Sequence, residues 1–468
     1  MGGRRARSTA RWVLAGCLCL LPGCLLSQGV ASPKNDSLEN VFQTAMAAQD
    51  RGDLDRAESL LRALRARHPG IFAIDESLGM LYVTRERIAE ALPLLQAATR
   101  DTPGSDAAHV NLGAAYFRLH RNQEALAEFQ LAARLNPGNA VTEQSLGRLW
   151  IEEHHPERAA EAFAAALKSN PGNTDLMLDR AQALLDSGDA TQAAAVLNEM
   201  PGVDQSAVAQ SLLGEANEKL GSYKDAALHL SHAVELDPSE ANAWALGVEF
   251  LRHWTFDAAI REFEVASAKF PNSVRMRLGL GAAYFGNGNY AKAVPVFANL
   301  LKADPGNHLD AELLGMSCTA VSMEAKPRCS ELIAYAESHP EDAKASTNAA
   351  AEIVEGKGND EQTPLARRLL ESAIRRDPKL AEAHYELAVL KQNQGDWAGS
   401  IPDLETALRL KPEFAKAHYK LALAYWRSGR KSEAQEHMEL QEKYRKQQQD
   451  DLDQRLRQIT TFLVDVHN

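Results

Sequence analysis

The sequence predicts an all-α solenoid, an array of about twelve short units that each hold two helices. Glycine, alanine and proline recur at intervals of 34 positions along the chain. Clear members of the three series are Gly79, Gly113 and Gly147, then Ala91, Ala125 and Ala159, then Pro103, Pro137 and Pro171. A period of about 20–50 residues is typical of arrays in which each unit contacts mainly its neighbours.

The composition agrees with packed helices and an acidic surface. Only 6% of the residues are aromatic, whereas 45% are hydrophobic, and the abundant alanine and leucine favour helices over strands. The formal net charge is −12, although the N-terminal segment 1–31 holds four arginines and no acidic residue. Because contacts with phosphates need clustered lysine and arginine, we expect no nucleic-acid partner.

The N-terminal segment 1–31 has the three-part pattern of a secretory signal peptide. Residues 1–11 are basic, residues 12–26 are almost purely apolar, and small residues follow as far as Ala31. The apolar stretch is short for a membrane span. We therefore expect an exported protein, periplasmic or secreted, with a short linker over 32–37 before the first unit.

A second interpretation of this segment is a membrane-anchored lipoprotein. The run Leu21-Pro22-Gly23-Cys24 resembles a bacterial lipobox, in which Cys24 would be acylated. Pro22 departs from the small or β-branched residue that is usual at its place. We favour the soluble form, and expect contact with a membrane only if Cys24 carries a lipid.

Two cysteines, Cys318 and Cys329, remain after the signal segment. Such sparse use of cysteine fits an oxidising compartment in which unpaired thiols are avoided. The two residues are 11 positions apart and fall on successive helices of one unit. Two interpretations stay open, a disulfide across that helical hairpin or two small buried thiols.

The period can be followed from residue 38 to residue 448. Most units end in Pro-Gly-Asn or Pro-x-x, which stops a helix and turns the chain into the next unit. Eight regular units fill 38–307, two irregular units fill 308–380, and two regular units fill 381–448. The expected boundaries are 38–71, 72–105, 106–139, 140–173, 174–206, 207–239, 240–273, 274–307, 308–342, 343–380, 381–414 and 415–448.

The unit at 106–139 illustrates the two expected helices. Leu112 and Tyr116 share one face at helical spacing, and the pattern restarts after a polar break with Ala125. Gly113 and Ala125 lie on opposite limbs of the hairpin. We expect these small residues to let the two backbones approach closely, with larger side chains filling the space beside the crossing.

This spacing resembles that of the tetratricopeptide repeat family. The pattern is a Leu-Gly or Leu-Ala pair, an aromatic residue, an alanine, a phenylalanine or leucine, a second alanine and a proline, and it covers 38–448. The resemblance implies helix-turn-helix repeats that coil into a right-handed superhelix. It also implies that the first helix of each unit lines a concave wall, and that the protein binds other proteins.

The two units in 308–380 depart from the pattern. Pro327 and Arg328 stand where a close-packed alanine belongs, and extra residues follow between Gly356 and Asp360. Proline suits the first turn of a helix, so we expect the second helix of the first irregular unit to begin at Pro327. In the next unit we expect a longer loop between the helices.

After residue 448 the repeat ends and an amphipathic stripe follows. The stripe consists of Leu452, Leu456, Ile459, Leu463 and Val466. A terminal repeat needs a cap over its open hydrophobic face, so we expect a C-terminal capping helix over 449–468. The alternative is a homo-oligomer joined through this helix.

The concave wall that the resemblance implies is unusually apolar and aromatic in this chain. Apolar patches with aromatic anchors and a few arginines are typical of partner sites. We expect a partner protein to bind there as an extended peptide or an amphipathic helix; the alternative is that these side chains pack against the next unit. The expected contact residues are Phe42, Met46, Met80, Phe117, Arg118, Arg148, Trp244, Leu251, Phe285, Met316, Tyr385, Tyr419 and Trp426.

The sequence offers no motif for catalysis, for a metal or for a cofactor. His229 and His232 lie three apart on one helix, but on the second helix of their unit, whose outward face is usually solvated. The motifs H-E-x-x-H and G-x-S-x-G and a phosphate-binding glycine loop are absent from the sequence. We therefore predict a protein that is not an enzyme, with no metal and no cofactor.

The sequence thus predicts a non-catalytic protein–protein interaction scaffold of the bacterial cell envelope. One alternative is a membrane-tethered lipoprotein that helps to assemble pili, secretion machinery or exported polysaccharide. A lower alternative is an enzyme of unknown reaction.

Overall fold

The computed structural model describes residues 37–320, 329–355 and 362–467, and describes side-chain burial as far as residue 449. Several predictions fall outside these ranges: the signal segment with Cys24, most of the linker, the helix start at Pro327, and the loop after Gly356. Within the described ranges the chain forms 24 α-helices and one short 3-10 helix and no strand, which confirms the all-α class.

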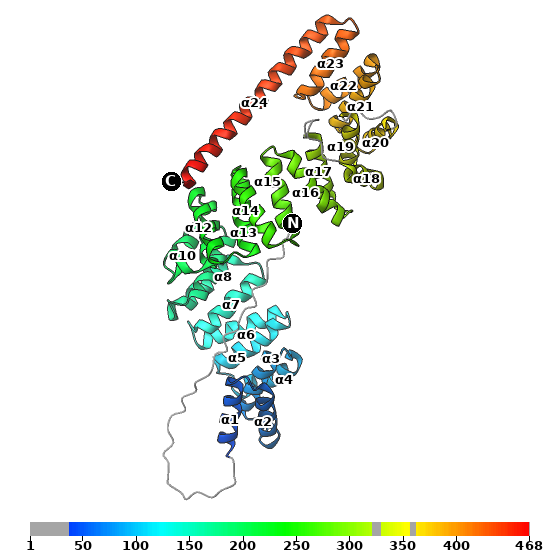
Figure 1. Cartoon of the computed structure of the whole chain (residues 1–468). Helices are drawn as coiled ribbons and strands as arrows, with labels where there is room; N and C mark the ends of the chain where they lie inside the picture. Colours follow the sequence, from blue (N-terminus) through cyan, green and yellow to red (C-terminus); the bar gives the residue numbers. More distant parts are fainter. Residues whose placement is uncertain (1–36, 321–328, 356–361, 468) are drawn as a thin grey trace, which may run out of the picture. The chain divides into compact units, whose positions relative to one another are not determined.

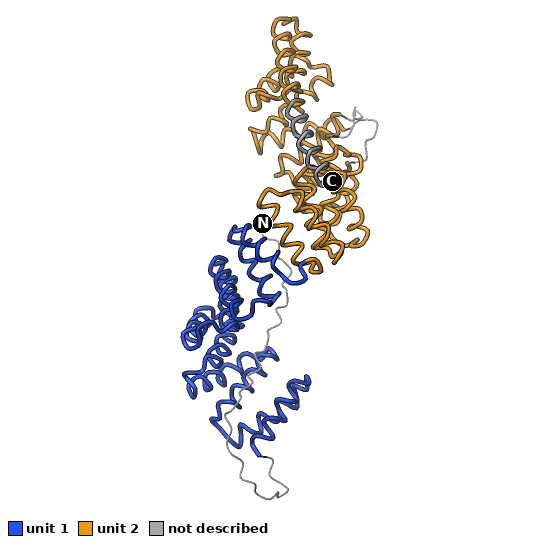
Figure 2. The backbone as a smooth tube through the Cα atoms, turned by 90° about the vertical axis from the view of Figure 1, so that its left-hand side faces the viewer, with its two compact units in different colours: residues 1–203 blue, residues 204–468 orange. Residues whose placement is uncertain are grey.

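The first compact unit reaches Val203 and holds ten helices (Figures 1 and 2). Each odd-numbered helix packs against the even-numbered helix that follows it. The helices are α1 (Leu38–Asp50), α2 (Leu54–Arg67), α3 (Phe72–Thr84), α4 (Ile88–Asp101), α5 (Asp106–Arg118), α6 (Asn122–Leu135), α7 (Ala140–Glu152), α8 (Pro156–Ser169), α9 (Thr174–Asp186) and α10 (Ala190–Asn198).

The second compact unit begins at Asp204 and holds the other fourteen helices (Figure 2). The 3-10 helix η1 (Val203–Gln205) lies at the boundary. The helices are α11 (Ala207–Lys219), α12 (Tyr223–Leu236), α13 (Glu240–Arg252), α14 (Phe256–Lys269), α15 (Val274–Gly286), α16 (Tyr290–Ala303), α17 (His308–Ala320), α18 (Ser330–Ser338), α19 (Ala343–Glu355), α20 (Thr363–Arg376), α21 (Ala381–Asn393), α22 (Trp397–Leu410), α23 (Ala415–Arg427) and α24 (Lys431–His467).

These helices make twelve pairs in the part of the chain that the structure describes, one pair for each predicted unit. The helical repeat solenoid is therefore confirmed. Within a pair we call the odd-numbered member the first helix and the even-numbered member the second helix. Each pair is short, 13 or 14 residues per helix in most cases, so it can bury its apolar face only against its neighbours.

The turn inside a pair repeats one backbone conformation. A single residue takes a positive φ there, for example 80° at Gly52 and 89° at Gly188. This left-handed region favours glycine, yet Glu86, His120 and His154 occupy the equivalent position with φ between 56° and 59°. His154 is therefore a turn residue.

The Pro-x-x punctuation ends one unit and also caps the next. Ser105 precedes α5, and its hydroxyl accepts a hydrogen bond from the backbone N–H of Ala108 at 3.2 Å. The side chain of Asn173 accepts one from Leu176 in the same way before α9. Such N-caps satisfy backbone donors that a helix leaves unpaired at its start, which explains the serine or asparagine that follows several of the prolines.

The regular spacing of glycine makes room for a side chain. A Cβ atom on Gly113 would lie 2.6 Å from the ring of Phe129, and one on Gly147 would lie 2.5 Å from the ring of Phe163. Both rings are almost completely buried. The missing side chain of each glycine thus lets an aromatic ring of the second helix lie on the first, and a large side chain fills the space at the crossing as expected.

The last helix is longer than predicted. A separate helix does not begin at residue 449, because α24 runs without a break from Lys431 to His467 (Figure 1). Its first turns belong to the last repeat: Ala434 is buried, and His437 shares a hydrogen bond of 2.8 Å with His418 of α23. The predicted C-terminal segment is thus the continuation of a second helix, and its roles as a cap or a dimer contact stay predictions.

A disulfide joins Cys318, in α17, to Cys329, which caps α18. This is the first of the two alternatives left open by the sequence. Both residues lie in the core of the second compact unit beside Leu332. Among the described helices, none combines the length and the apolar character that a membrane span requires.

Candidate functional site

The predicted contact residues lie on first helices and differ strongly in exposure. Met316 on α17 and Tyr419 on α23 are 42% and 43% exposed, and Trp426 on α23 is 63% exposed. Single exposed apolar side chains are ordinary on protein surfaces, whereas neighbouring ones are informative. These three residues meet the expectation of a large apolar side chain open to a partner.

The predicted contact residues of the first compact unit are mostly covered. Phe42, Met46, Met80 and Phe117 are half-buried and pack against the core of that unit. The core beneath them includes Leu78, Tyr82, Leu112 and Tyr116. The sequence left open whether these side chains bind a partner or pack against neighbouring units. Much of the surface of these four side chains is used for packing.

Two arginines on first helices contribute charge to the same unit. The guanidinium of Arg118 lies 3.9 Å from the carboxylate of Glu86. Arg148 lies near Asp179, where burial raises the pKa of the Asp179 carboxyl and the charge of Arg148 partly opposes that rise. Both arginines therefore interact with acidic residues of adjacent repeats.

The remaining predicted contact residues pack in aromatic pairs of the second compact unit. Trp244 lies 5.8 Å from Phe263, and Phe285 lies 5.2 Å from Tyr290, measured between ring centroids. Leu251 is half-buried against the same local core as Trp244. The pairs hold first helices to second helices, so these half-buried side chains take part in packing within their own repeats.

Tyr385 is the most deeply buried of the predicted contact residues. It is 9% exposed and its ring lies 4.9 Å from that of Phe414. Burial, together with the charges of Glu386 and Glu355, raises the pKa of the Tyr385 hydroxyl. Tyr385 therefore forms part of the core between two repeats.

Two of the three predicted contact residues that remain exposed lie on α23. Tyr419, Leu423 and Trp426 follow one another at positions i, i+4 and i+7, so they share one face of the helix. We call these three residues the α23 stripe. Leu423 is half-buried between its two exposed neighbours.

Basic and acidic side chains accompany the α23 stripe. Lys416 and Lys420 stand on the same helix and act on Glu386 of α21, the first helix of the preceding repeat. Burial and the nearby Glu355 raise the pKa of Glu386 to about 8, in spite of the two lysines. An apolar stripe with lysines beside it suits a partner segment that carries apolar and acidic residues.

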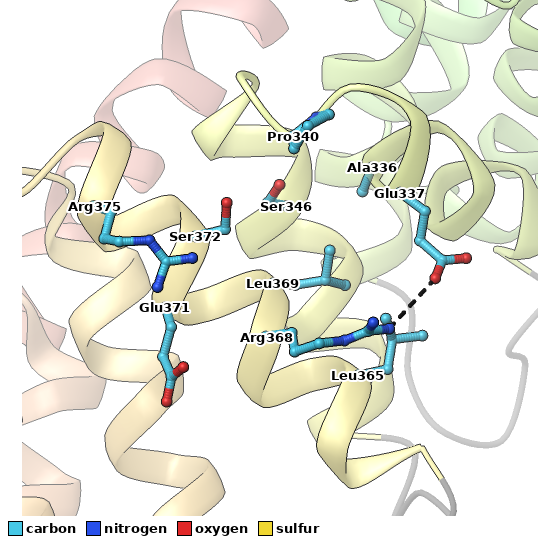
Figure 3. Close-up of a pocket in the computed structure, with 10 residues that line it drawn as sticks. All are labelled: Ala336, Glu337, Pro340, Ser346, Leu365, Arg368, Leu369, Glu371, Ser372 and Arg375. Atoms are coloured by element: carbon cyan, nitrogen blue, oxygen red, sulfur yellow. Dashed lines mark ion pairs between the residues drawn. The ribbon is translucent and has the colours of Figure 1, made fainter.

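A pocket of about 290 Å³ lies among α18, α19 and α20 (Figure 3). Arg368 reaches toward Glu337 across it, with 3.7 Å between nitrogen and oxygen. Its lining is Ala336, Glu337, Pro340, Ser346, Leu365, Arg368, Leu369, Glu371, Ser372 and Arg375. The lining mixes charged residues with small and apolar ones.

The histidine pair noted in the sequence is explained by packing. Nδ1 of His229 lies 2.7 Å from the side-chain oxygen of Gln210, and burial lowers the pKa of the His229 imidazole. A different set, which the sequence analysis missed, does come together: ligand atoms of Glu218, Glu249 and His253 lie within 4.8 Å of one another. The only signal in the sequence was Glu249 and His253 at i and i+4.

The carboxyl groups of Glu218 and Glu249 differ in the direction of their pKa shifts. Burial and the neighbouring Glu218 raise the pKa of Glu249 to about 8. Burial would also raise the pKa of Glu218, but the hydrogen bond with His253 and the nearby Arg252 bring it below its usual range. One carboxylate is therefore held ionised and its deeper neighbour is not.

The fold and the surface define a class: a helical-repeat protein of the kind that serves as a scaffold for protein–protein interaction. Models of the tetratricopeptide repeat match most parts of the chain and together span more than half of it. The chain belongs to the tetratricopeptide repeat family. The matched segments are 42–106, 76–140, 151–216, 245–308, 393–429 and 415–447.

Several solved structures resemble the chain at low sequence identity. The protein pilF of Pseudomonas aeruginosa is 18% identical over 44% of this chain and 95% of its own, with a TM-score of 0.39. YrrB, described as a TPR protein with an unusual peptide-binding site, is 17% identical over 40% and 97%, with a TM-score of 0.36. A chain of the Naa15/Naa10 complex bound to HypK-THB is 17% identical over 86% and 68%, with a TM-score of 0.34. No curated protein matches the sequence.

Proposed function

We propose that this protein is a non-catalytic scaffold of the bacterial cell envelope, and that it binds a partner protein through the first helices of its repeats. The observation that carries the proposal is the α23 stripe, where Trp426 is 63% exposed and Tyr419 is 43% exposed on one helical face. The occupant is an amphipathic helix or an extended peptide with apolar and acidic residues.

The α23 stripe supports binding through its residue types. Tryptophan and tyrosine dominate binding hot spots because they bury a large rigid area and also carry a hydrogen-bonding group. Lys416 and Lys420 stand beside the stripe and carry positive charge on a chain whose net charge is −12. Acidic groups of a partner would find their complement there and would be repelled by much of the remaining surface.

Two independent features support the proposed location in the cell envelope. The N-terminal segment 1–31 has the pattern of a signal peptide. The disulfide between Cys318 and Cys329 suits an oxidising compartment such as the periplasm or the exterior. Together they support export of the chain before it meets its partner.

A capture experiment tests the binding surface. In-cell crosslinking followed by affinity capture would compare the unaltered protein with a variant that combines Tyr419→Ala and Trp426→Ala. Each replacement of a hot-spot aromatic is expected to cost about 2 kcal/mol of binding free energy. The amount of partner captured by the double variant should therefore fall at least tenfold.

The matched control is Val265→Ala, because Val265 is equally open at 68% exposure but lies on a second helix, α14. Capture that falls in the control as much as in the double variant would place the contact elsewhere. Equal capture by all three proteins, with unchanged helicity, would overturn the role of the α23 stripe.

Lipid attachment separates the two forms of the envelope proposal. The soluble form predicts that cells fed radiolabelled palmitate incorporate no label into the protein. Label that is present in the unaltered protein and lost in a Cys24→Ser variant would favour the membrane-tethered accessory factor.

A further inference from the structure

Three ligand-capable side chains meet where two consecutive repeats pack. Glu218 stands at the end of α11, Glu249 stands near the end of α13, and His253 caps α13. Nε2 of His253 lies 2.9 Å from Oε2 of Glu218 and 3.4 Å from Oε1 of Glu249. One nitrogen and two carboxylate oxygens from different repeats therefore converge on one point.

Arg252 orients the two carboxylates toward this point. Its Nη1 atom lies 3.2 Å from Oε1 of Glu218 and 3.7 Å from Oε2 of Glu249. Each carboxylate thus turns one oxygen to the arginine and the other oxygen to His253. We call the oxygen that faces His253 the inner oxygen. Metal sites commonly fix a ligand in this way: a neighbouring group binds the outer atom of the ligand, and the inner atom points to the metal.

The inner oxygen of Glu249 accepts no hydrogen bond from a nitrogen or hydroxyl donor of the described residues. Glu249 is only 2% exposed, and its carboxyl group keeps a proton that it shares with the carboxyl group of Glu218. The N–H of His253 is directed to Glu218, whose Oε2 atom is the nearer of the two. A buried carboxylate oxygen without a donor costs free energy unless a proton or a cation satisfies it.

We propose that Glu218, Glu249 and His253 bind a divalent transition-metal ion of the zinc class, which clamps α11 to α13. His253 would bind through the lone pair of Nε2 and carry its proton on Nδ1, while each glutamate would supply its inner oxygen. The ion takes the place of the Nε2 proton that His253 now directs at Glu218.

Spacing and chemistry both fit such an ion. Ligand atoms about 2.1 Å from one zinc ion lie about 3.4 Å apart in a tetrahedral arrangement and about 3.0 Å apart in an octahedral one. The two separations from Nε2, 2.9 Å and 3.4 Å, are close to these values. One imidazole and two carboxylates are a ligand set that zinc and its neighbours accept, and three protein ligands leave a position for water.

The site is reachable from solvent, and its outer wall is aromatic. The side chains of His253 and Glu218 are 16% and 18% exposed, so an ion can enter without unfolding the helices. The ring of Tyr223, the first residue of α12, lies 4.1 Å from the ring of His253 and restricts its rotation. The inference does not depend on the partner proposed above, because it concerns the joint between two repeats.

The test is a titration of the full-length mature protein, free of any histidine tag and stripped with a chelator. Zn²⁺ binding would be measured by equilibrium dialysis, and Co²⁺ would report the ligand geometry through its visible absorption. We expect one ion per chain at micromolar concentration and a rise in Tm on adding Zn²⁺. Glu218→Gln, Glu249→Gln and His253→Gln should each weaken binding at least tenfold.

The matched control is His308→Gln, which removes an exposed histidine that pairs with the single carboxylate of Asp342 at 2.5 Å. This variant should bind Zn²⁺ as the unaltered protein does. The proposal is overturned if the unaltered protein binds no ion in a one-to-one ratio, or if binding survives all three glutamine variants, which would mean adventitious binding to surface residues only. The titration of the unaltered protein alone shows whether one ion binds per chain. A variant that fails to fold therefore does not obscure that result.

Discussion

Phenylalanine at the middle of a second helix and glycine at the middle of the first helix form the central contact of several repeats. Phe129, Phe163 and Phe263 are buried, and each lies where a Cβ atom on the facing glycine would stand less than 3.0 Å away. In a core packed as densely as a protein interior, a ring held on all sides has no free volume into which it can move. The glycine that recurs in the sequence thus leaves the space that the phenylalanine ring of the second helix fills.

This contact predicts that Gly147→Ala destabilises the protein. The new methyl group would lie 2.5 Å from the ring of Phe163. Overpacking should cost about 1–3 kcal/mol, from which the better helix propensity of alanine recovers up to about 1 kcal/mol. Thermal melting followed by circular dichroism would show a lower Tm for the first compact unit.

Gly172→Ala is the control for that variant, because an added Cβ atom there meets nothing within 4 Å. Its Tm should stay within experimental error of the unaltered protein. A Gly147→Ala variant as stable as the Gly172→Ala variant would show that the ring of Phe163 moves aside at little cost.

Glu386 predicts a dependence of stability on pH. Its carboxyl faces Glu355, Lys416 and Lys420, and burial raises its pKa to about 8 from the ordinary 4.5. The folded state therefore holds the proton more tightly than the unfolded state, so this group lowers stability as pH rises from about 4.5 through 8. Because the side chain is only half-buried, solvent screening reduces the effect to about 1 kcal/mol.

The variant Glu386→Gln should remove this loss. We expect its Tm at pH 9 to exceed that of the unaltered protein by about 2–4 °C, and the two values to agree at pH 4. Melting curves at both pH values provide the measurement. A difference of equal size at pH 4 and pH 9 would mean that packing, and not the charge of Glu386, distinguishes the two proteins.

At the scale of elements, turns and caps explain where the helices of a repeat begin and end. A residue with positive φ closes the turn inside a pair, and a serine or asparagine after the proline caps the next first helix. Both features are local, because they depend on a few neighbouring residues. The length of α24 is different: the sequence beyond residue 448 loses the repeat but keeps the propensity for a helix, so the helix continues.

The disulfide is the element-scale feature with the largest expected effect on stability. Cys318 and Cys329 tie the end of α17 to the start of α18 across 11 positions. Closing a loop of this size restricts the unfolded chain and should add about 2–3 kcal/mol. We expect that a reductant, or the double variant Cys318→Ser with Cys329→Ser, lowers the Tm of the second compact unit.

The double variant also provides the control for the reductant. The other three cysteines lie within the N-terminal segment 1–31, so a mature double variant contains no thiol and should melt at the same temperature with and without reductant. If the unaltered protein melts identically under both conditions, the disulfide does not contribute to stability.

At the scale of the whole molecule, the chain is a series of local cores. Among the described residues, clusters of buried side chains lie in the first compact unit and, separately, in the second. Each is built from adjacent helix pairs, as expected when units contact their neighbours in sequence. This arrangement allows a long chain to fold without a single large core, and it leaves many first helices with a side open to other molecules.

The sequence by itself determined the helical class and the number of repeats, because these follow from a 34-residue period and from the proline and glycine punctuation between units. The pairing of Cys318 with Cys329 was one of two open choices. Which of the predicted contact residues stay exposed, as Trp426 does, and which pack away, as Tyr385 does, was decided only by the tertiary structure. The same is true of the meeting of Glu218 with His253, because the distance between side chains of different repeats depends on how the helices dock and not on any local pattern.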